Sequence, residues 1–94
     1  MDDRPIESAD LMLDGNGVAG LLTALFGIDV TLVPATCAHC HTISMMGSVR
    51  AFVRAPGTVL RCPVCGKVMM RVVETPYSTL VEMRGIASIR LDRV

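Results

Sequence analysis

Apolar residues in the N-terminal third of the chain recur at the spacing of one helix face. Five of them fall at positions i, i+3, i+4, i+7 and i+8: Val18, Leu21, Leu22, Leu25 and Phe26. Such spacing is typical of an amphipathic helix. Asp14 or Asn16 can cap its first turn, and Gly27 can end it. The pattern predicts a helix over residues 14–27, which either lies on a sheet or also mediates contact with a second copy.

The rest of the chain favours strands. A β-branched run predicts a strand over 30–33 that Pro34 ends, and residues 42–47 form a loop or a weak strand start. Residues 48–54 alternate, so Arg50, Phe52 and Arg54 share one face. A turn at 55–58 then leads into a strand ending at residue 61. Further strands are predicted over 68–74, 79–84 and 87–91, with a turn at 75–78.

Composition restricts the class of protein. Residues 1–12 show no firm periodicity and are expected to form a flexible N-terminal segment, whereas 13–94 form a single domain. The chain is 51% apolar, yet Phe26, Phe52 and Tyr77 are its only aromatic residues, so the core must be aliphatic. So much aliphatic surface in a small chain predicts a protein partner, which a second copy could provide.

Four cysteines carry the candidate chemistry. Cys37 and Cys40 form one Cys-x-x-Cys pair, and Cys62 and Cys65 form another after 21 intervening residues. Each such turn points two sulfurs into one small volume, which suits a tetrahedral Zn²⁺ with zinc–sulfur bonds of about 2.3 Å. Four thiolates leave no open position for water, so the pattern predicts a structural zinc site. No nucleophile arrangement is visible, and we expect neither an enzyme nor a small-molecule substrate.

Other interpretations of the cysteines remain open. His39 or His41 could replace a thiolate as a ligand or make the site exchangeable, as in a metal-handling protein. Rubredoxins also use two Cys-x-x-Cys turns, for iron, although their aromatic core has no counterpart here. A single Cys-x-x-Cys pair could also act as a redox dithiol, but the surrounding βαβ pattern is missing.

Charge and hydropathy bear on compartment and partners. The longest apolar run, residues 17–28, is too short to cross a bilayer, so no membrane association is expected. The acidic N-terminus does not have the pattern of a signal peptide, and a cytoplasmic location is expected. The net charge is zero, although bases dominate residues 36–91. Arg50, Phe52 and Arg54 could therefore form a nucleic-acid-binding face, in which the ring stacks a base and the arginines meet phosphates.

Several motifs resemble an uncharacterised bacterial family of short zinc-ribbon-like proteins, a domain of unknown function. They are LDGN at 13–16, AG at 19–20, FG at 26–27, the two cysteine turns, RAPGTVLRCP at 54–63 and LVEMRG at 80–85. The resemblance covers most of residues 13–91 and implies a zinc ribbon with four cysteine ligands, but no activity. The expected fold is a small α+β domain, a zinc-ribbon-like antiparallel β structure with one N-terminal helix. The expected function is a non-enzymatic zinc-binding module that mediates protein–protein interaction.

Overall fold

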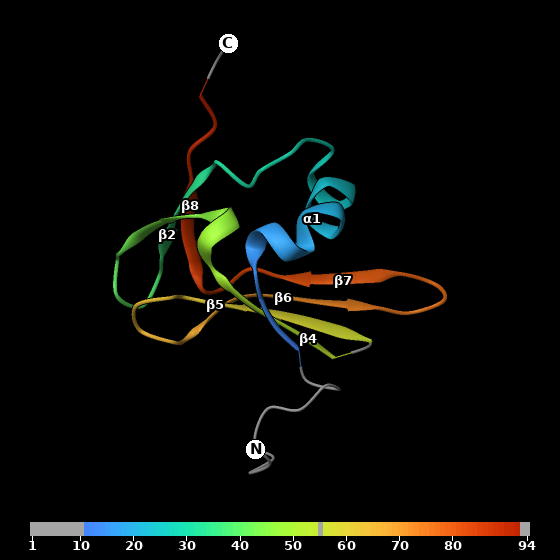
Figure 1. Ribbon diagram of the computed structural model, residues 1–94. Coiled ribbons are helices and arrows are strands. Elements are labelled where there is room, and N and C mark those ends of the chain that lie inside the picture. The colour runs from blue at the N-terminus through green and yellow to red at the C-terminus, as the bar shows by residue number, and fades with distance from the viewer. Residues whose placement is uncertain (1–10, 55, 93–94) are drawn as a thin grey trace.

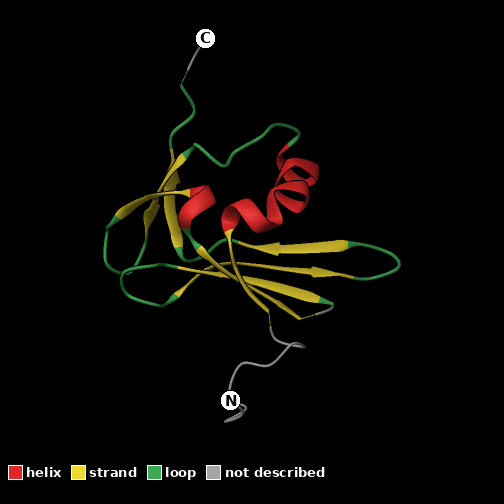
Figure 2. Cartoon of the chain, viewed as in Figure 1, coloured by secondary structure: helices red, strands yellow, loops and turns green. Residues whose placement is uncertain are grey.

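The computed structural model describes residues 11–54 and 56–92. In this part of the chain one α-helix accompanies two antiparallel sheets, one of five strands and one of three (Figure 1). The helix and the three-stranded sheet lie on the same side of the five-stranded sheet, with two short 3₁₀ segments between them (Figure 2). The protein is therefore a small α+β domain with one helix near its N-terminus, as the sequence predicted.

The five-stranded sheet has the order β1-β4-β5-β6-β7. Its strands are β1 (Leu11–Asp14), β4 (Arg50–Arg54), β5 (Gly57–Arg61), β6 (Val68–Glu74) and β7 (Thr79–Glu82). The predicted strands between residues 48 and 84 are confirmed, although β4 begins two residues late and β7 ends two residues early. Strand β1 was not predicted, because its first residues fell in the expected flexible segment. Residues 1–10, the rest of that segment, lie outside the described residues.

The three-stranded sheet has the order β3-β2-β8. Its strands are β2 (Pro34–Cys37), β3 (Ile43–Met45) and β8 (Ile86–Ile89). The weak strand start expected over 42–47 is β3, followed by a 3₁₀ turn, η2 (Met46–Ser48). The last predicted strand is also present. It leaves the five-stranded sheet and pairs with β2, and this connection ties the C-terminal end of the chain to the first cysteine turn.

The strand predicted over 30–33 is wrong. Asp29 Oδ1 accepts hydrogen bonds from the Thr31 backbone N–H at 2.9 Å and from its hydroxyl at 2.8 Å. The Val33 N–H then closes a turn onto the Val30 carbonyl. Pro34, expected to end a strand, instead begins β2. A proline is tolerated at the first position of a strand because its missing N–H removes no essential ladder bond.

The predicted helix is confirmed, with a 3₁₀ first turn. Segment η1 (Gly15–Val18) begins after Asp14, whose side chain accepts a hydrogen bond from the Gly17 N–H at 3.0 Å. Helix α1 (Ala19–Phe26) ends at Gly27, which has the left-handed φ of 78°. Val18 and Leu22 face the core, as the spacing predicted. No helix in the described part of the chain is long and apolar enough to span a bilayer.

Two bulges lie beside the cysteine turns. In β6, Met69 is an extra residue, because Leu60 pairs with Met70 whereas Arg61 pairs with Val68. In β8, the register shifts where Cys37 pairs with Ile86. A bulge interrupts strict alternation and re-aims the side chains that follow. Consequently Met69 and Met70 are consecutive in sequence, yet both are buried.

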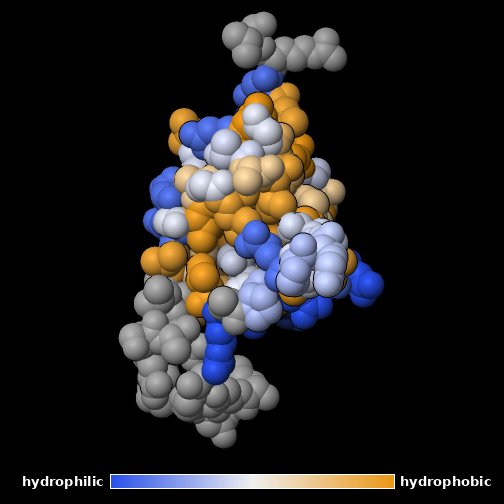
Figure 3. All heavy atoms as spheres, turned by 90° about the vertical axis from the view of Figure 1, so that its right-hand side faces the viewer, coloured by the Kyte–Doolittle hydropathy of each residue, from blue (hydrophilic) through white to orange (hydrophobic). Residues whose placement is uncertain are grey.

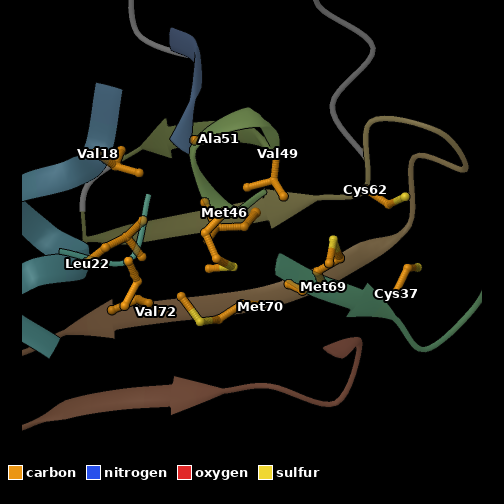
Figure 4. Packing of buried hydrophobic residues seen from close by; sticks show 13 residues of the cluster. Val18, Leu22, Cys37, Met46, Val49, Ala51, Cys62, Met69, Met70 and Val72 are labelled. Carbon is orange, nitrogen blue, oxygen red and sulfur yellow. The ribbon is translucent and has the colours of Figure 1, made fainter. Parts of the chain in front are cut away.

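The core is aliphatic and rich in methionine, as the composition predicted. Its five largest fully buried side chains come from α1, η2, β5 and β6: Leu22, Met46, Leu60, Met69 and Met70. Figure 4 shows Leu22 beside Val72 and Met70 at one end of this cluster, and Cys37 and Cys62 at the other. The cysteines therefore continue the hydrophobic core rather than standing apart from it.

Candidate metal centre

Each cysteine pair lies in the turn of a hairpin. Cys37 ends β2, and the chain returns through Cys40 into β3; Cys62 follows β5, and the chain returns through Cys65 into β6. One hairpin belongs to the three-stranded sheet and the other to the five-stranded sheet. A metal ion held by both turns would therefore link the two sheets.

The two turns have the same hydrogen-bond pattern. In the first turn the Cys37 N–H donates to the Thr42 carbonyl at 2.9 Å, and the His41 N–H donates to the Cys37 carbonyl at 3.0 Å. In the second turn Cys62 bonds the Lys67 carbonyl and Gly66 bonds the Cys62 carbonyl, both at 2.9 Å. Each turn also aims one amide at its first sulfur, since the His39 and Val64 N–H groups lie 3.4 Å from Cys37 Sγ and Cys62 Sγ.

The four sulfurs form a compact group. Cys37 Sγ lies 3.7 Å from Cys65 Sγ, and Cys40 Sγ lies 3.7 Å from Cys62 Sγ. All four atoms lie within 4.8 Å of one another. A regular tetrahedron with metal–sulfur bonds of about 2.3 Å has edges of about 3.8 Å, so the separations fit a four-thiolate metal site. The cysteines are free, and sulfurs bonded in a disulfide would lie about 2.05 Å apart.

His41 and Gly66 occupy equivalent positions after the second cysteine of each turn. Both residues have a left-handed backbone conformation, with φ of 64° for His41 and 76° for Gly66. Glycine adopts this region without steric cost, whereas a residue with a Cβ is strained there. His41 therefore stands where the second turn has a glycine, and the strain of the first turn lies at this residue.

The surroundings of the sulfurs differ between the inner and outer cysteines. Cys37 and Cys62 are buried, whereas Cys40 and Cys65 are half-buried. The Thr42 hydroxyl, 3.3 Å from Cys40 Sγ, and then the Thr42 backbone amide lower the pKa of Cys40 to about 6. The Lys67 amide lowers the pKa of Cys65, but burial and hydrogen bonds with the other three cysteines together raise it to about 11. Protonated thiols must lose their protons before they can bind a metal.

His39 and His41 are exposed and are not part of the sulfur group that could hold a metal within the described residues.

Sequence reasoning missed two other residues that support the site. Thr42 bonds Cys40 Sγ, and its position next to the turn was the only available signal. Gly85 joins three elements, because its N–H donates to the Met69 carbonyl and its carbonyl accepts from the Ala38 N–H. In the sequence Gly85 only follows the strand predicted over 79–84 and belongs to the LVEMRG motif.

Gly85 must be a glycine because it lies against the backbone of β6. A Cβ at this position would be 1.9 Å from the Val68 carbonyl oxygen. The β7–β8 connection therefore passes directly between the first cysteine turn and the start of β6. This contact links the first cysteine turn of the three-stranded sheet to β6 of the five-stranded sheet, next to the four sulfurs.

Arg50, Phe52 and Arg54 lie on the face of β4 that points away from the core, since Ala51 between them is fully buried. Both arginines are exposed, and Phe52 is half-buried. The Arg61 guanidinium lies over the Phe52 ring, 5.8 Å from its centroid, and donates to the Gly66 carbonyl at 3.0 Å. The ring that sequence analysis assigned to base stacking therefore has a cation over one of its faces.

The fold and the sulfur group define a small α+β protein with a zinc-ribbon-like cysteine cluster that could bind a metal. The chain belongs to a family of unknown function (DUF6510), which matches residues 7–94. The match includes residues 7–12, which the sequence-based resemblance had left out. No curated protein and no solved structure matches the chain.

Proposed function

We propose that this protein is a non-enzymatic, protein-binding module built around a structural zinc site. The observation that carries the proposal is the group of four sulfurs within 4.8 Å of one another, contributed by hairpins from two different sheets. Zinc favours four thiolates in tetrahedral structural sites, and such a shell has no position for substrate or water. A reducing cytoplasm, where thiols persist as ligands, is the compartment that fits this proposal.

Energetic magnitudes support a structural role for the metal. At about 0.05–0.15 kcal/mol per residue, a domain of 94 residues has a net stability of roughly 5–14 kcal/mol. Structural zinc contributes apparent binding free energies of about 10–16 kcal/mol at pH 7. The free energy of zinc binding is therefore as large as the whole net stability expected for such a domain, so folding of this chain is expected to depend on the metal.

The interaction role rests on exposed apolar side chains. Among the described residues, large apolar groups that are more than half exposed include Ile28 and Leu32, from the α1–β2 connection, and Tyr77, from the tip of the β6–β7 hairpin. Exposed apolar residues that gather on one face are typical of protein-binding surfaces. We assign the binding function to such a surface rather than to the metal.

Native mass spectrometry of freshly purified protein tests the metal part of this proposal. We expect one zinc ion per chain, identified by its mass. Replacing Cys62 with Ser should abolish stoichiometric loading, whereas Ser44→Ala in the same purification should leave it unchanged. Iron in place of zinc, or a purified chain that folds without metal, would contradict the proposal.

Nucleic-acid binding is a second candidate, favoured by the outer face of the five-stranded sheet. Arg50, Arg54, Arg61 and Arg71 lie on this face by register, and Glu82 pairs with Arg71 at 3.1 Å. Binding to single-stranded oligonucleotides should then weaken steeply with salt. The double variant Arg50→Gln/Arg71→Gln should bind more weakly than wild type. Binding that is absent at low salt would eliminate this candidate.

A further inference from the structure

The four sulfurs are not equally protected from solvent. Cys37 and Cys62, the first cysteine of each turn, are buried, whereas Cys40 and Cys65, the second of each turn, are half-buried. Each first sulfur also accepts a hydrogen bond from an amide of its own turn, at 3.4 Å. A cysteine reacts with a dissolved reagent only where solvent reaches its sulfur. Such a reagent therefore meets Cys40 or Cys65 first.

The backbone after these two outer cysteines differs in strain. His41 follows Cys40 and Gly66 follows Cys65, with φ of 64° and 76°. Only His41 carries a Cβ, which makes this left-handed conformation unfavourable. The closed turn holds His41 there, because its N–H donates to the Cys37 carbonyl. Release of Cys40 lets the backbone of His41 relax, whereas release of Cys65 relieves no strain.

Hydrogen bonds from outside each turn hold different parts of the two turns. In the second turn the Arg61 guanidinium donates to the Gly66 carbonyl at 3.0 Å, directly after the second cysteine. In the first turn the Ala38 N–H donates to the Gly85 carbonyl at 2.8 Å, before the second cysteine. The outer half of the second turn is therefore braced by Arg61, whereas in the first turn the brace lies on the inner half and leaves Cys40 beyond it.

The strands that leave the two turns differ as well. After the first turn the chain enters β3, which has three residues and lies at the edge of its sheet. Ile43 and Met45 of this strand are 65% and 46% exposed. After the second turn the chain enters β6, which has seven residues and lies between β5 and β7. Segments with few buried contacts open locally most easily. The first hairpin can therefore open while the five-stranded sheet stays folded.

We propose that Cys40 is a modification site for soft electrophiles, because it is the metal ligand at which the site opens. This inference rests on the metal part of the proposed function. With a maleimide, the Cys40 sulfur donates an electron pair to one alkene carbon, so that a carbon–sulfur bond forms and the alkene π bond breaks. Water then protonates the neighbouring carbon. The product is an uncharged thioether in place of the thiolate that a structural zinc site uses.

The modification site lies away from the surface proposed for protein binding. Figure 3 looks at the end of the molecule that carries the tip of the β6–β7 hairpin, and it shows a hydrophobic area there. Both cysteine turns lie at the other end, at the left of Figure 1. A partner seated on the hydrophobic area would not shield Cys40, so the reactivity of Cys40 can be tested independently of any partner.

Limited labelling of the full, zinc-loaded chain with N-ethylmaleimide tests the inference. The reaction is stopped in acid while most chains are still unlabelled, and mass spectrometry of the peptides locates the label. We expect Cys40 to carry at least about five times as much label as Cys65, because relief of left-handed strain corresponds to a factor of about 5–30. The two buried cysteines, Cys37 and Cys62, should carry the least.

Three variants separate backbone strain from the chemistry of the imidazole. His41→Gly removes the strain and should lower the labelling rate of Cys40 about fivefold or more. His41→Ala removes the imidazole but keeps the Cβ, so Cys40 should be labelled as in the wild type. Gly66→Ala places a Cβ in the second turn and should raise the labelling rate of Cys65. Circular dichroism of each loaded variant checks that it is folded.

Three outcomes would overturn the inference. They are a first label on Cys65, equal labelling of all four cysteines as in a chain that reacts only when it unfolds, and an unchanged rate at Cys40 in His41→Gly. Native mass spectrometry of the unlabelled samples separates this inference from the proposed function. A zinc-loaded protein with another order of labelling contradicts the inference alone, whereas a folded chain without zinc contradicts the structural zinc site.

Discussion

At the scale of single residues, one strained position distinguishes the two cysteine turns. His41 and Gly66 have the same hydrogen bonds and the same left-handed backbone, but only His41 carries a Cβ. Left-handed conformation costs a residue with a Cβ roughly 1–2 kcal/mol. The first turn is therefore the weaker half of the site, although it supplies two of the four sulfurs.

Glycine substitution at residue 41 should stabilise the protein. We expect His41→Gly to raise the free energy of unfolding of the loaded protein by up to about 1 kcal/mol, and Gly66→Ala to lower it by about 1 kcal/mol. The measurement is denaturant unfolding at fixed zinc concentration. His39→Gly is the control, since it adds backbone freedom without relieving strain and should be destabilising. A loss of stability in His41→Gly as large as in His39→Gly would contradict the account.

Arg61 links the second turn to the five-stranded sheet. Its guanidinium bonds the Gly66 carbonyl at 3.0 Å and covers the Phe52 ring. Arg61→Ala should cost about 1–2 kcal/mol, the sum of one hydrogen bond and one cation–π contact. Arg71→Ala removes an exposed ion pair with Glu82 and should cost less than about 1 kcal/mol. Thermal unfolding compares the two, and equal losses would show that Arg61 has no special role.

The role of a single residue could be predicted from the sequence when its partners are close to it along the chain. Spacing alone picked out the four cysteines, since each pair closes its own turn. The Asp14 cap was also visible, because a cap bonds an amide three residues away. Thr42 and Gly85 were not recognised as supports, because their roles depend on a sulfur geometry and on a strand 16 residues away that only the fold brings together.

At the scale of elements, the β7–β8 connection joins the two sheets. Gly85 donates to β6 at Met69 and accepts from the first cysteine turn at Ala38. The strand pattern predicted β6, β7 and β8, but it could not indicate that β8 leaves the meander to pair with β2. The pairing of β8 with β2 depends on the close approach of Gly85 to the backbone of β6 and on the bulges beside both cysteine turns. Hydrophobic periodicity encodes neither feature.

Alanine at position 85 should separate these elements. The added Cβ would meet the Val68 carbonyl oxygen, which belongs to the backbone and cannot rotate away. We expect Gly85→Ala to cost at least about 2 kcal/mol and to weaken zinc retention against a chelator. Gly57→Ala, where the nearest atom to an added Cβ lies 3.7 Å away, is the control with little expected effect. Wild-type retention in Gly85→Ala would contradict this role.

The strand wrongly predicted over 30–33 is explained by local hydrogen bonds that form a turn. β-branched residues favour strands, but Asp29 captures the Thr31 amide and hydroxyl and starts a turn there. Val30 is buried in the core although it belongs to no strand. Strand propensity reflects packing on a pleated surface, and local side-chain bonds override it when no neighbouring strand is available.

At the scale of the whole molecule, two small sheets share one core and one sulfur group. Cys37 and Cys62 lie at the end of the hydrophobic cluster, so the metal site and the core are continuous (Figure 4). The molecule therefore has, at one end of its core, four cysteines that could hold a metal ion and that come from both sheets.

Hydrogen exchange before and after metal removal tests the central claim, that one metal ion holds the two sheets together. In the loaded protein the amides of Cys37 and Cys62 should be protected, because they bond the Thr42 and Lys67 carbonyls. After a strong chelator removes the metal, we predict that protection is lost together in β2, β8, β5 and β6 and returns when zinc is added back. Protection that survives in either sheet without metal would contradict the account.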